Sequence, residues 1–155
     1  MTEEFGMFMV GLGLGAALTL AVAPASCRAD TWVVGTVASH HFEHPDTHNE
    51  RNFGLGFETD VARDVRAIGG FYKNSNYRET VYAGAAWLPF RVGNFRLGAA
   101  GVLATGYAPY PVVPAIFGVV TYERQNWGVN LGFIPPASSI KQPAVLGLQF
   151  KLLYQ

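Results

Sequence analysis

Four histidines and three carboxylates lie close together in this sequence, between positions 40 and 50. They are His40, His41, His44 and His48, with Glu43, Asp46 and Glu50. Imidazoles and carboxylates are ligands for zinc, nickel and copper, and a histidine with a perturbed pKa can act as a general base. The spacing matches no fixed metal motif, and Pro45 interrupts the stretch. We therefore interpret it as a solvated loop and expect no metal ion and no cofactor.

The composition is that of a membrane protein with very little helix. Of the 155 residues, 50% are hydrophobic and only 14% are charged, against roughly 25% charged in ordinary globular domains. Eleven acidic residues balance eleven basic ones, so no basic field indicates a nucleic-acid partner. The single cysteine, Cys27, excludes an internal disulfide and a cysteine-based structural zinc site.

The N-terminal segment is apolar. Residues 5–25 form an unbroken apolar stretch, and Cys27-Arg28-Ala29 fits the small-x-small rule for signal cleavage. We interpret residues 1–29 as a secretory signal peptide, although Thr2-Glu3-Glu4 supplies no positive charge. The alternative is a retained helix, since the stretch is long enough to span a bilayer. Pro24 argues against a lipid anchor on Cys27, because it stands where such signals favour leucine.

The stretch from Ile68 to Trp87 predicts a hairpin with a polar tip at residues 73–76. Before the tip, Phe71 and its alternate neighbours form one face, and Tyr72 belongs to the other. After the tip, Val81 faces one side and Gly84 the other. A strand of a soluble protein usually alternates apolar with polar residues, whereas here one face is apolar and the other is mostly glycine and alanine. This pattern favours a narrow barrel with lipid outside.

Short strand-like segments separated by turn signals continue to the end of the chain. They predict strands at 31–42, 50–60, 64–73, 77–88, 93–106, 112–123, 126–135 and 143–154. Short turns alternate with longer loops, as in up-and-down outer-membrane barrels. We therefore predict an all-β fold, an eight-stranded antiparallel up-and-down transmembrane β-barrel formed by residues 30–155. The predicted location is the bacterial outer membrane.

The last two strands show the cleanest alternation, with bulky residues on one face and Asn130, Gln149 and Lys151 on the other. Only a closed barrel satisfies the backbone hydrogen bonds of strands in a bilayer. Aromatic residues near the strand ends predict interfacial girdles: Trp32, Phe42, Phe53, Trp87, Phe90, Phe95 and Tyr154. The alternative is a soluble barrel of the lipocalin type, with its apolar residues inside.

Five arginines fall at the ends of predicted strands, at positions 63, 66, 78, 91 and 96. They could bind lipopolysaccharide phosphates, or they could be ordinary solvated turn residues. The sequence contains no Gly-x-Ser-x-Gly elbow, Walker loop or His-Glu-x-x-His motif.

Several stretches, in order, resemble the lipid A palmitoyltransferase family of outer-membrane barrels over residues 38–155. The strongest are Asn49-Glu50-Arg51, Phe53-Gly54-Leu55-Gly56, Lys73-Asn74-Ser75, Ala83-Gly84 and Trp87. Weaker ones are Asn94-Phe95-Arg96-Leu97-Gly98, Pro111-Val112-Val113-Pro114, Phe133-Ile134-Pro135 and Leu148-Gln149-Phe150. In that family a phospholipid enters the barrel sideways, and its palmitate is moved to lipid A at the outer surface.

The resemblance implies three catalytic positions, a histidine on the first strand and an Asp-Ser pair at the tip of the third. The serine falls on Ser75. The aspartate falls on Asn74, and asparagine cannot accept a proton at neutral pH, so acid–base work there should suffer. The histidine falls within Ser39-His40-His41-Phe42, where strand parity counted from Phe42 favours His41 over His40.

The resemblance also implies how a lipid would reach the lumen. The family opens lateral gaps with prolines that cannot donate ladder hydrogen bonds, and Pro114 and Pro135 match one gap. The second gap lacks its prolines, and Asn52 stands at one of the expected positions. The glycine at the floor of the family's acyl pocket corresponds to Ala86, so we expect an acyl chain shorter than palmitate. We predict that Gly84 and Tyr72 share this ligand site.

These observations give three hypotheses. The first is a monomeric outer-membrane barrel that binds an acyl chain or lipid and transfers it from phospholipid to lipid A of lipopolysaccharide. Its partners are membrane lipids, with no nucleic acid. The second is a non-enzymatic barrel with a structural, lipid-binding or surface-exclusion role and a phage or prophage origin. Asn74 beside Ser75 is the feature that divides them. A soluble periplasmic lipid carrier is a third hypothesis.

Overall fold

The computed structural model describes residues 29–43, 45–137 and 142–154. It contains β1 (Thr31–His41), β2 (Gly54–Ala62), β3 (Val65–Lys73), β4 (Glu79–Val92), β5 (Phe95–Thr105), β6 (Val112–Arg124), β7 (Trp127–Ile134) and β8 (Val145–Tyr154). A short 3-10 helix, η1 (Pro45–Thr47), follows β1. No helix of the described residues is long and apolar enough to cross a membrane. The predicted signal segment lies outside the described residues, except for Ala29.

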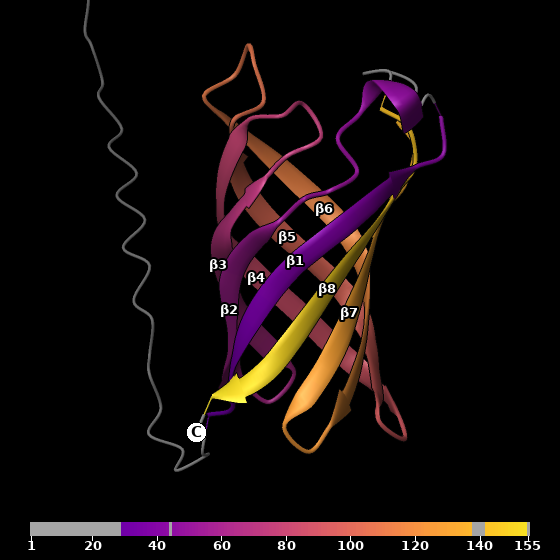
Figure 1. Ribbon diagram of the computed structural model, residues 1–155. Coiled ribbons are helices and arrows are strands. Elements are labelled where there is room, and N and C mark those ends of the chain that lie inside the picture. Colours follow the sequence, from indigo (N-terminus) through magenta and orange to yellow (C-terminus); the bar gives the residue numbers. More distant parts are fainter. Residues whose placement is uncertain (1–28, 44, 138–141, 155) are drawn as a thin grey trace, which may run out of the picture.

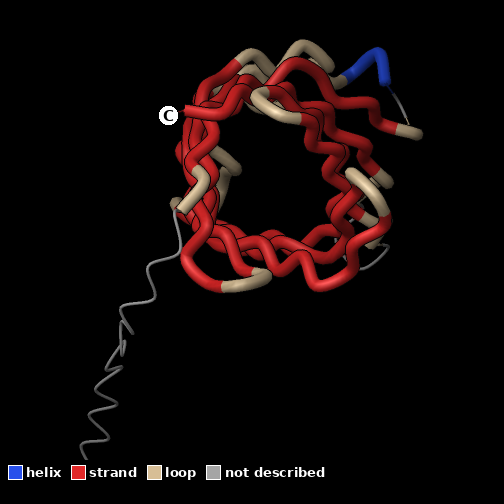
Figure 2. The backbone as a smooth tube through the Cα atoms, turned by 90° about the horizontal axis from the view of Figure 1, so that it is seen from below, coloured by secondary structure: helices blue, strands red, loops and turns tan. Residues whose placement is uncertain are grey.

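Each strand pairs in antiparallel fashion with the next, and β8 closes the ring by pairing with β1 from Thr31↔Tyr154 to His41↔Val145. Seen along its axis, the backbone forms a closed ring around a lumen (Figure 2). The predicted eight-stranded antiparallel up-and-down barrel is therefore confirmed. Closure gives each of the eight strands two neighbours, so that the ring has no edge strand.

The two ends of the barrel differ (Figure 1). At the turn end, two-residue turns follow β2, β4 and β6, and the turn after β4 contains Gly93 at φ 58°. At the loop end, longer connections follow β1, β3, β5 and β7. The predicted second strand begins four residues late, at Gly54, because residues 49–52 form a hydrogen-bonded loop. The fourth strand runs past its predicted end, because Pro89 lies in a bulge where no ladder hydrogen bond is required.

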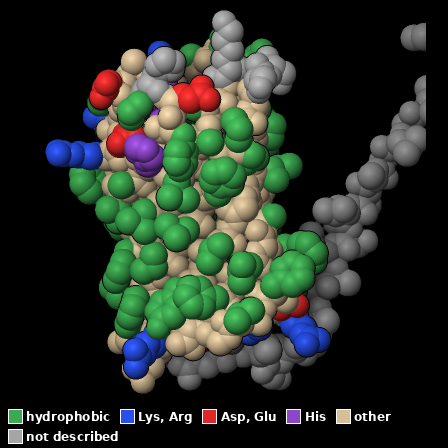
Figure 3. Space-filling model, turned by 90° about the vertical axis from the view of Figure 1, so that its right-hand side faces the viewer, with side chains coloured by type: hydrophobic (Ala, Val, Ile, Leu, Met, Phe, Trp, Pro, Cys, Tyr) green, Lys and Arg blue, Asp and Glu red, His purple; other side chains and the backbone are tan. Residues whose placement is uncertain are grey.

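The outer surface of the barrel is apolar. Exposed side chains from every strand cover its waist, and charged side chains gather toward the ends of the face in Figure 3. Bulky examples are Val33, Leu55, Phe57, Phe71, Val81, Leu103, Ile116, Leu131, Phe133, Leu148, Phe150 and Leu152. The buried side chains are mainly polar, among them Glu58, Arg66, Thr121, Asn130 and Lys151. This is the reverse of a lipocalin-type barrel, whose apolar residues face inward.

Six of the seven aromatic side chains predicted for the girdles are exposed on the outer surface. Phe42 and Phe53 at the loop end are exposed, as are Trp87 and Tyr154 nearer the turn end. Trp32 is only 3% exposed and faces the lumen, so its assignment to a girdle is wrong. The Lys151 ammonium lies 5.1 Å from the centre of its ring, which explains the inward position as a cation–π contact.

Glycines on β2 and β3 make room for a tyrosine of β4 that lies over them inside the barrel. A Cβ atom on Gly56 would lie 2.8 Å from the Tyr82 hydroxyl and 2.5 Å from the Gly69 carbonyl oxygen. A Cβ atom on Gly70 would lie 3.1 Å from the same hydroxyl. These glycines therefore allow Tyr82 to reach across from β4. They also show why the sequence at this face is so rich in small residues.

We predict that Gly56→Ala lowers the free energy of unfolding by about 1–3 kcal/mol, because the added methyl overpacks the lumen. The control is Gly101→Ala, where a Cβ atom meets nothing within 4 Å. Urea unfolding of the refolded barrel, followed by tryptophan fluorescence, measures both. Equal stability of the two variants would contradict the role assigned to Gly56.

Candidate functional site

A cavity of about 220 Å³ occupies the loop-end half of the lumen. One part of its wall is mostly apolar and comes from β3 to β6. Polar groups come from β1, β8 and the loop before β2, beside the apolar Ile134, Val145 and Leu148. The main lining residues are Thr36, Ser39, His41, Asn52, Ile68, Tyr72, Ser75, Tyr82, Ala86, Ala100, Val102, Tyr107, Phe117, Val119 and Gln149. Single-ligand pockets usually measure about 300–1,000 Å³. The cavity is thus suited to part of one chain of a lipid and not to a whole two-chain lipid.

His41 faces this cavity, and His40 is exposed on the opposite side of β1, so the parity prediction is confirmed. A bulge between Thr36 and Ala38 shifts the register of β1 against β8 just below this point. The His41 ring stacks on the His48 ring, with centroids 4.3 Å apart. The Nδ1 atom of His41 is buried and has no hydrogen-bond partner among the described residues. No carboxylate therefore holds this imidazole from its Nδ1 side.

Glu50 fixes the backbone of His41 rather than its ring. One Glu50 oxygen accepts a hydrogen bond from the His41 backbone N–H at 3.0 Å, and the same oxygen lies 3.1 Å from His40 Nδ1. The His41 N–H, helped by the neighbouring His40 ring, holds the pKa of the Glu50 carboxyl below its usual range. Glu50 therefore stays ionised at neutral pH and anchors the loop end of β1.

Asn74 is fully buried and uses every hydrogen-bonding group of its amide. Its Nδ2 donates to Thr80 Oγ1 and to the Gly106 carbonyl oxygen, both at 3.0 Å. Its Oδ1 accepts from the backbone N–H groups of Asn76 and Arg78, at 2.9 and 3.0 Å. A carboxylate could not donate the first two bonds. The residue therefore ties the β3–β4 loop to the β5–β6 loop in a way that aspartate cannot.

Ser75 lines the same cavity as His41, so the structure brings these two predicted residues to one site. The backbone carbonyl of Ser75 accepts a hydrogen bond from the Asn49 N–H at 2.8 Å, which joins two loops at the mouth. The Tyr72 hydroxyl, on the same wall, lies 2.8 Å from the Tyr107 hydroxyl. Tyr107 is a site residue that the sequence analysis missed, because nothing in a loop sequence indicates which tyrosine turns inward.

Ala86 and Tyr72 line the cavity as predicted, but Gly84 does not. Gly84 instead borders a shallow groove with Gly101, Leu103 and Pro114. A Cβ atom on Gly84 would lie 2.0 Å from the Gly101 carbonyl oxygen. Close approach of β4 to β5 therefore explains this glycine.

Two boundaries between strands lack ladder pairing at the loop end. The β6–β7 ladder begins at Gly118↔Phe133, so that β6 from Val112 to Phe117 has no partner on that side among the described residues. Pro114 and Pro135 are both exposed and flank this boundary. We call it the β6–β7 seam. The β1–β2 ladder likewise ends at Thr36↔Gly54.

The β1–β2 boundary is closed by side chains instead of a ladder. Ser39 Oγ donates to Asn52 Oδ1 at 2.6 Å, and Asn52 Nδ2 donates to the carbonyl oxygens of Asn49 and Lys73. The Ser39 N–H also donates to the Glu50 carbonyl oxygen at 3.0 Å. Asn52 stands where the family resemblance implies a proline. Its hydrogen bonds therefore hold this boundary closed.

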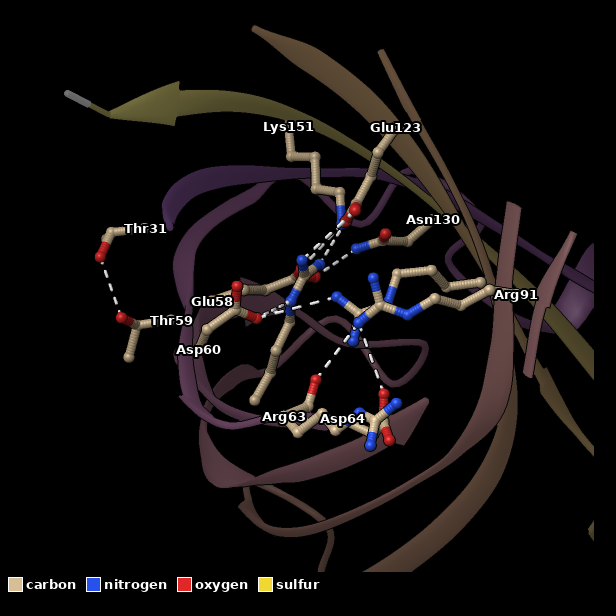
Figure 4. A network of polar contacts seen from close by, with 12 residues as sticks. Thr31, Glu58, Thr59, Asp60, Arg63, Asp64, Arg91, Glu123, Asn130 and Lys151 are labelled. Carbon is tan, nitrogen blue, oxygen red and sulfur yellow. Dashed lines mark hydrogen bonds and ion pairs between the residues drawn. The ribbon is translucent and has the colours of Figure 1, made fainter. Parts of the chain in front are cut away.

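Below the cavity, charged side chains fill the turn-end half of the lumen (Figure 4). Lys151 Nζ donates to Glu58 Oε2 at 2.9 Å and to Glu123 Oε1 at 2.7 Å. Arg66 binds Asp60 at 2.7 Å through Nε and also binds Glu58 and Glu123. Asn130 donates to Glu58 and to Gln149. This network forms the floor of the cavity and obstructs a straight path through the barrel.

The position of Arg66 and Arg96 corrects one of the alternatives drawn from the sequence. They are only 2% and 7% exposed and face the lumen, so they do not lie on the rim as solvated or phosphate-binding residues. Arg63 and Arg91 do lie at the turn end, where Arg91 Nη2 donates to the Arg63 carbonyl oxygen. Strand parity with Ile68 could have placed Arg66 inside, since the two are two residues apart on β3.

The histidine-rich stretch shows no metal centre. Within residues 29–43, 45–137 and 142–154, no group of three histidine, cysteine, aspartate or glutamate side chains is placed to hold a metal ion. His44 lies outside the described residues.

Comparison with models of known protein families gives no match, and no curated protein shows significant similarity to the chain.

We predict that Asn74→Asp destabilises the barrel by about 1–3 kcal/mol per donated hydrogen bond lost, because it leaves buried acceptors unpaired and adds a buried charge. The control is Asn76→Asp, whose side chain is exposed in the same loop. Urea unfolding at pH 7 compares the two. Asn74→Asp as stable as the parent chain would refute the structural role of this amide.

Lys151→Met, which removes the charge but keeps most of the volume, should lower the free energy of unfolding by about 3–5 kcal/mol, because Glu58 and Glu123 lose a buried cation. Lys73→Met is the matched control, since Lys73 is exposed at the loop end. Both are measured by urea unfolding. If Lys151→Met lowered the free energy of unfolding by less than Lys73→Met, the network would not depend on Lys151.

Proposed function

We propose that this chain is a bacterial outer-membrane β-barrel that binds one acyl chain of a lipid in its loop-end cavity and transfers that chain from phospholipid to lipid A. The location is supported by the apolar outer face, the aromatic residues at both ends and the contrast between short turns and longer loops. A barrel with this surface would expose its apolar waist to water if it remained in solution.

The observation that carries the proposal is the shape and lining of the cavity. It ends on the charged network inside the barrel, so a bound chain enters from the loop end or from the side and does not pass through. The β6–β7 seam offers a lateral route, because strands without ladder bonds can separate at low cost. A phospholipid in the outer leaflet could insert one chain there while its headgroup stays outside.

His41 and Ser75 at the mouth supply the chemistry of transfer. His41 takes the proton of an acceptor hydroxyl, and the acceptor oxygen attacks the ester carbonyl of the phospholipid. The bond from the acyl carbon to the glycerol oxygen breaks, and that oxygen takes the proton back from His41. The Ser75 hydroxyl donates a hydrogen bond to the carbonyl oxygen as it gains negative charge. One ester replaces another, so the reaction requires no cofactor.

A second function, lipid binding without transfer, is favoured by one specific observation. The Asn74 amide is fully engaged in structural hydrogen bonds, and His41 Nδ1 has no partner among the described residues. An imidazole without an orienting acceptor is a weaker general base. In this form the barrel would hold a lipid at the outer surface in a structural or surface-exclusion role.

We predict that the refolded chain in detergent, mixed with phospholipids of defined chain length and lipopolysaccharide, adds one acyl chain to lipid A. Mass spectrometry of lipid A measures the product and the length of the chain, which should be shorter than palmitate because the Ala86 methyl group occupies the cavity wall. His41→Ala should lower the rate by about 100-fold or more. Ser75→Ala should lower it as well.

The control for this assay is His40→Ala, which removes the exposed neighbour of His41 and should leave the rate near that of the parent chain. Heat-modifiable migration on a gel verifies that each variant is folded. No added mass from a folded barrel that still binds fatty acid would support the second function. A chain that stays in solution without detergent would contradict the membrane location.

A further inference from the structure

The cavity has two chemically different walls, and a saturated acyl chain satisfies only one of them. The apolar wall is formed by Ile68, Ala86, Ala100, Val102, Phe117 and Val119 from β3 to β6. On the polar side, Thr36 of β1 lies opposite Gln149 of β8, and Ser39 lies opposite Gly147. An alkyl chain can pack against the first wall, but it offers no hydrogen bond to the second.

Below the mouth, the polar wall has a hydrogen-bond donor to spare. Gln149 Nε2 donates to Thr36 Oγ1 at 3.1 Å, and Gln149 Oε1 accepts from Asn130 Nδ2 at 3.2 Å. Because the Thr36 hydroxyl accepts in this pair, its own hydrogen remains to be donated. No acceptor for that hydrogen occurs among the hydrogen bonds of the described part of the chain.

Tyr82 brings another hydroxyl to the same level. Its hydroxyl oxygen lies over Gly56 and Gly70, and its side chain lines the same cavity as Gln149. We call Thr36, Tyr82 and Gln149 the polar shelf. All three residues line the cavity. The shelf is held by glycines and neighbouring amides, so it is a built feature of the wall and not a chance exposure of polar groups.

The polar shelf lies well below the predicted reaction centre. Thr36 precedes His41 by five residues on β1, which corresponds to about 16 Å along the strand and about 12 Å along the axis of a barrel whose strands tilt by about 40°. A chain whose ester is held at the mouth, beside His41 and Ser75, would therefore reach the shelf with its distal half. Groups near the ester would remain above it.

We propose that the cavity selects an acyl chain that carries a hydroxyl group in its distal half, and that this hydroxyl accepts a hydrogen bond from Thr36. This inference rests on the proposed acyl-chain binding. A plain alkyl chain leaves the shelf unsatisfied or holds ordered water against hydrocarbon, and either arrangement weakens binding. A hydroxyl at the right depth replaces that water and accepts the hydrogen bond, so that the shelf is satisfied and binding is not weakened.

Three fatty acids of equal length test the proposal: decanoate, 3-hydroxydecanoate and 10-hydroxydecanoate. Each is titrated into the refolded chain in detergent, and calorimetry gives its dissociation constant. We expect 10-hydroxydecanoate to bind about tenfold more tightly than decanoate, which is the effect of one net hydrogen bond. The 3-hydroxy acid should bind like decanoate, because its hydroxyl stays near the mouth.

Thr36→Val keeps the shape of the side chain and removes the hydroxyl, so it should abolish the preference without weakening decanoate binding. Gln149→Leu provides a second variant of the shelf, with the same expected loss. Val102→Ala is the control on the apolar wall, and it should weaken all three acids to the same extent.

The outcomes separate this inference from the function on which it rests. Equal binding of decanoate and 10-hydroxydecanoate, or a preference that survives both Thr36→Val and Gln149→Leu, overturns the inference and leaves acyl-chain binding intact. Binding of none of the three acids by a folded barrel overturns acyl-chain binding, and the inference with it.

Discussion

The ion network in the turn-end half of the lumen is the interaction on which the rest of the barrel depends. Three cations, Arg66, Arg96 and Lys151, share the space with Glu58, Asp60 and Glu123, so the charges there balance. They come from five different strands, and removal of one would leave its partners buried and uncompensated. The network therefore joins the wall from inside, and it also gives the cavity above it a floor.

Because that floor closes the lumen, access to the cavity is decided at the loop end. There the strands are held by side-chain amides where the ladders stop. Asn52 joins β1 to the start of β2 by hydrogen bonds, and Asn74 joins two loops. The β6–β7 seam has no such bonds among the described residues. The β1–β2 boundary is thus held by hydrogen bonds, whereas the strands at the β6–β7 seam can separate more easily. In the proposed function, this asymmetry would make the β6–β7 seam the lateral route for a lipid chain.

The sequence predicted the barrel well, because alternation along each strand is a local property. It also placed His41 inward by parity from Phe42. Strand parity with Ile68 could have placed Arg66 in the lumen as well, but not its partners, because Glu123 is 57 residues away in the sequence. Nor could it show that Asn74 is held by Gly106, since that contact requires two loops to meet across the barrel mouth.

The position of Asn74 bears on how this site relates to a carboxylate-based one. If asparagine were a simple loss of a catalytic acid, its amide would have no need for partners of its own. Instead both Nδ2 hydrogens and the Oδ1 atom of Asn74 form hydrogen bonds. Thr80 Oγ1, which accepts one of them, in turn donates a hydrogen bond to the Thr105 carbonyl oxygen. The surroundings are adapted to an amide. In the proposed transfer, His41 would therefore act without a carboxylate at position 74.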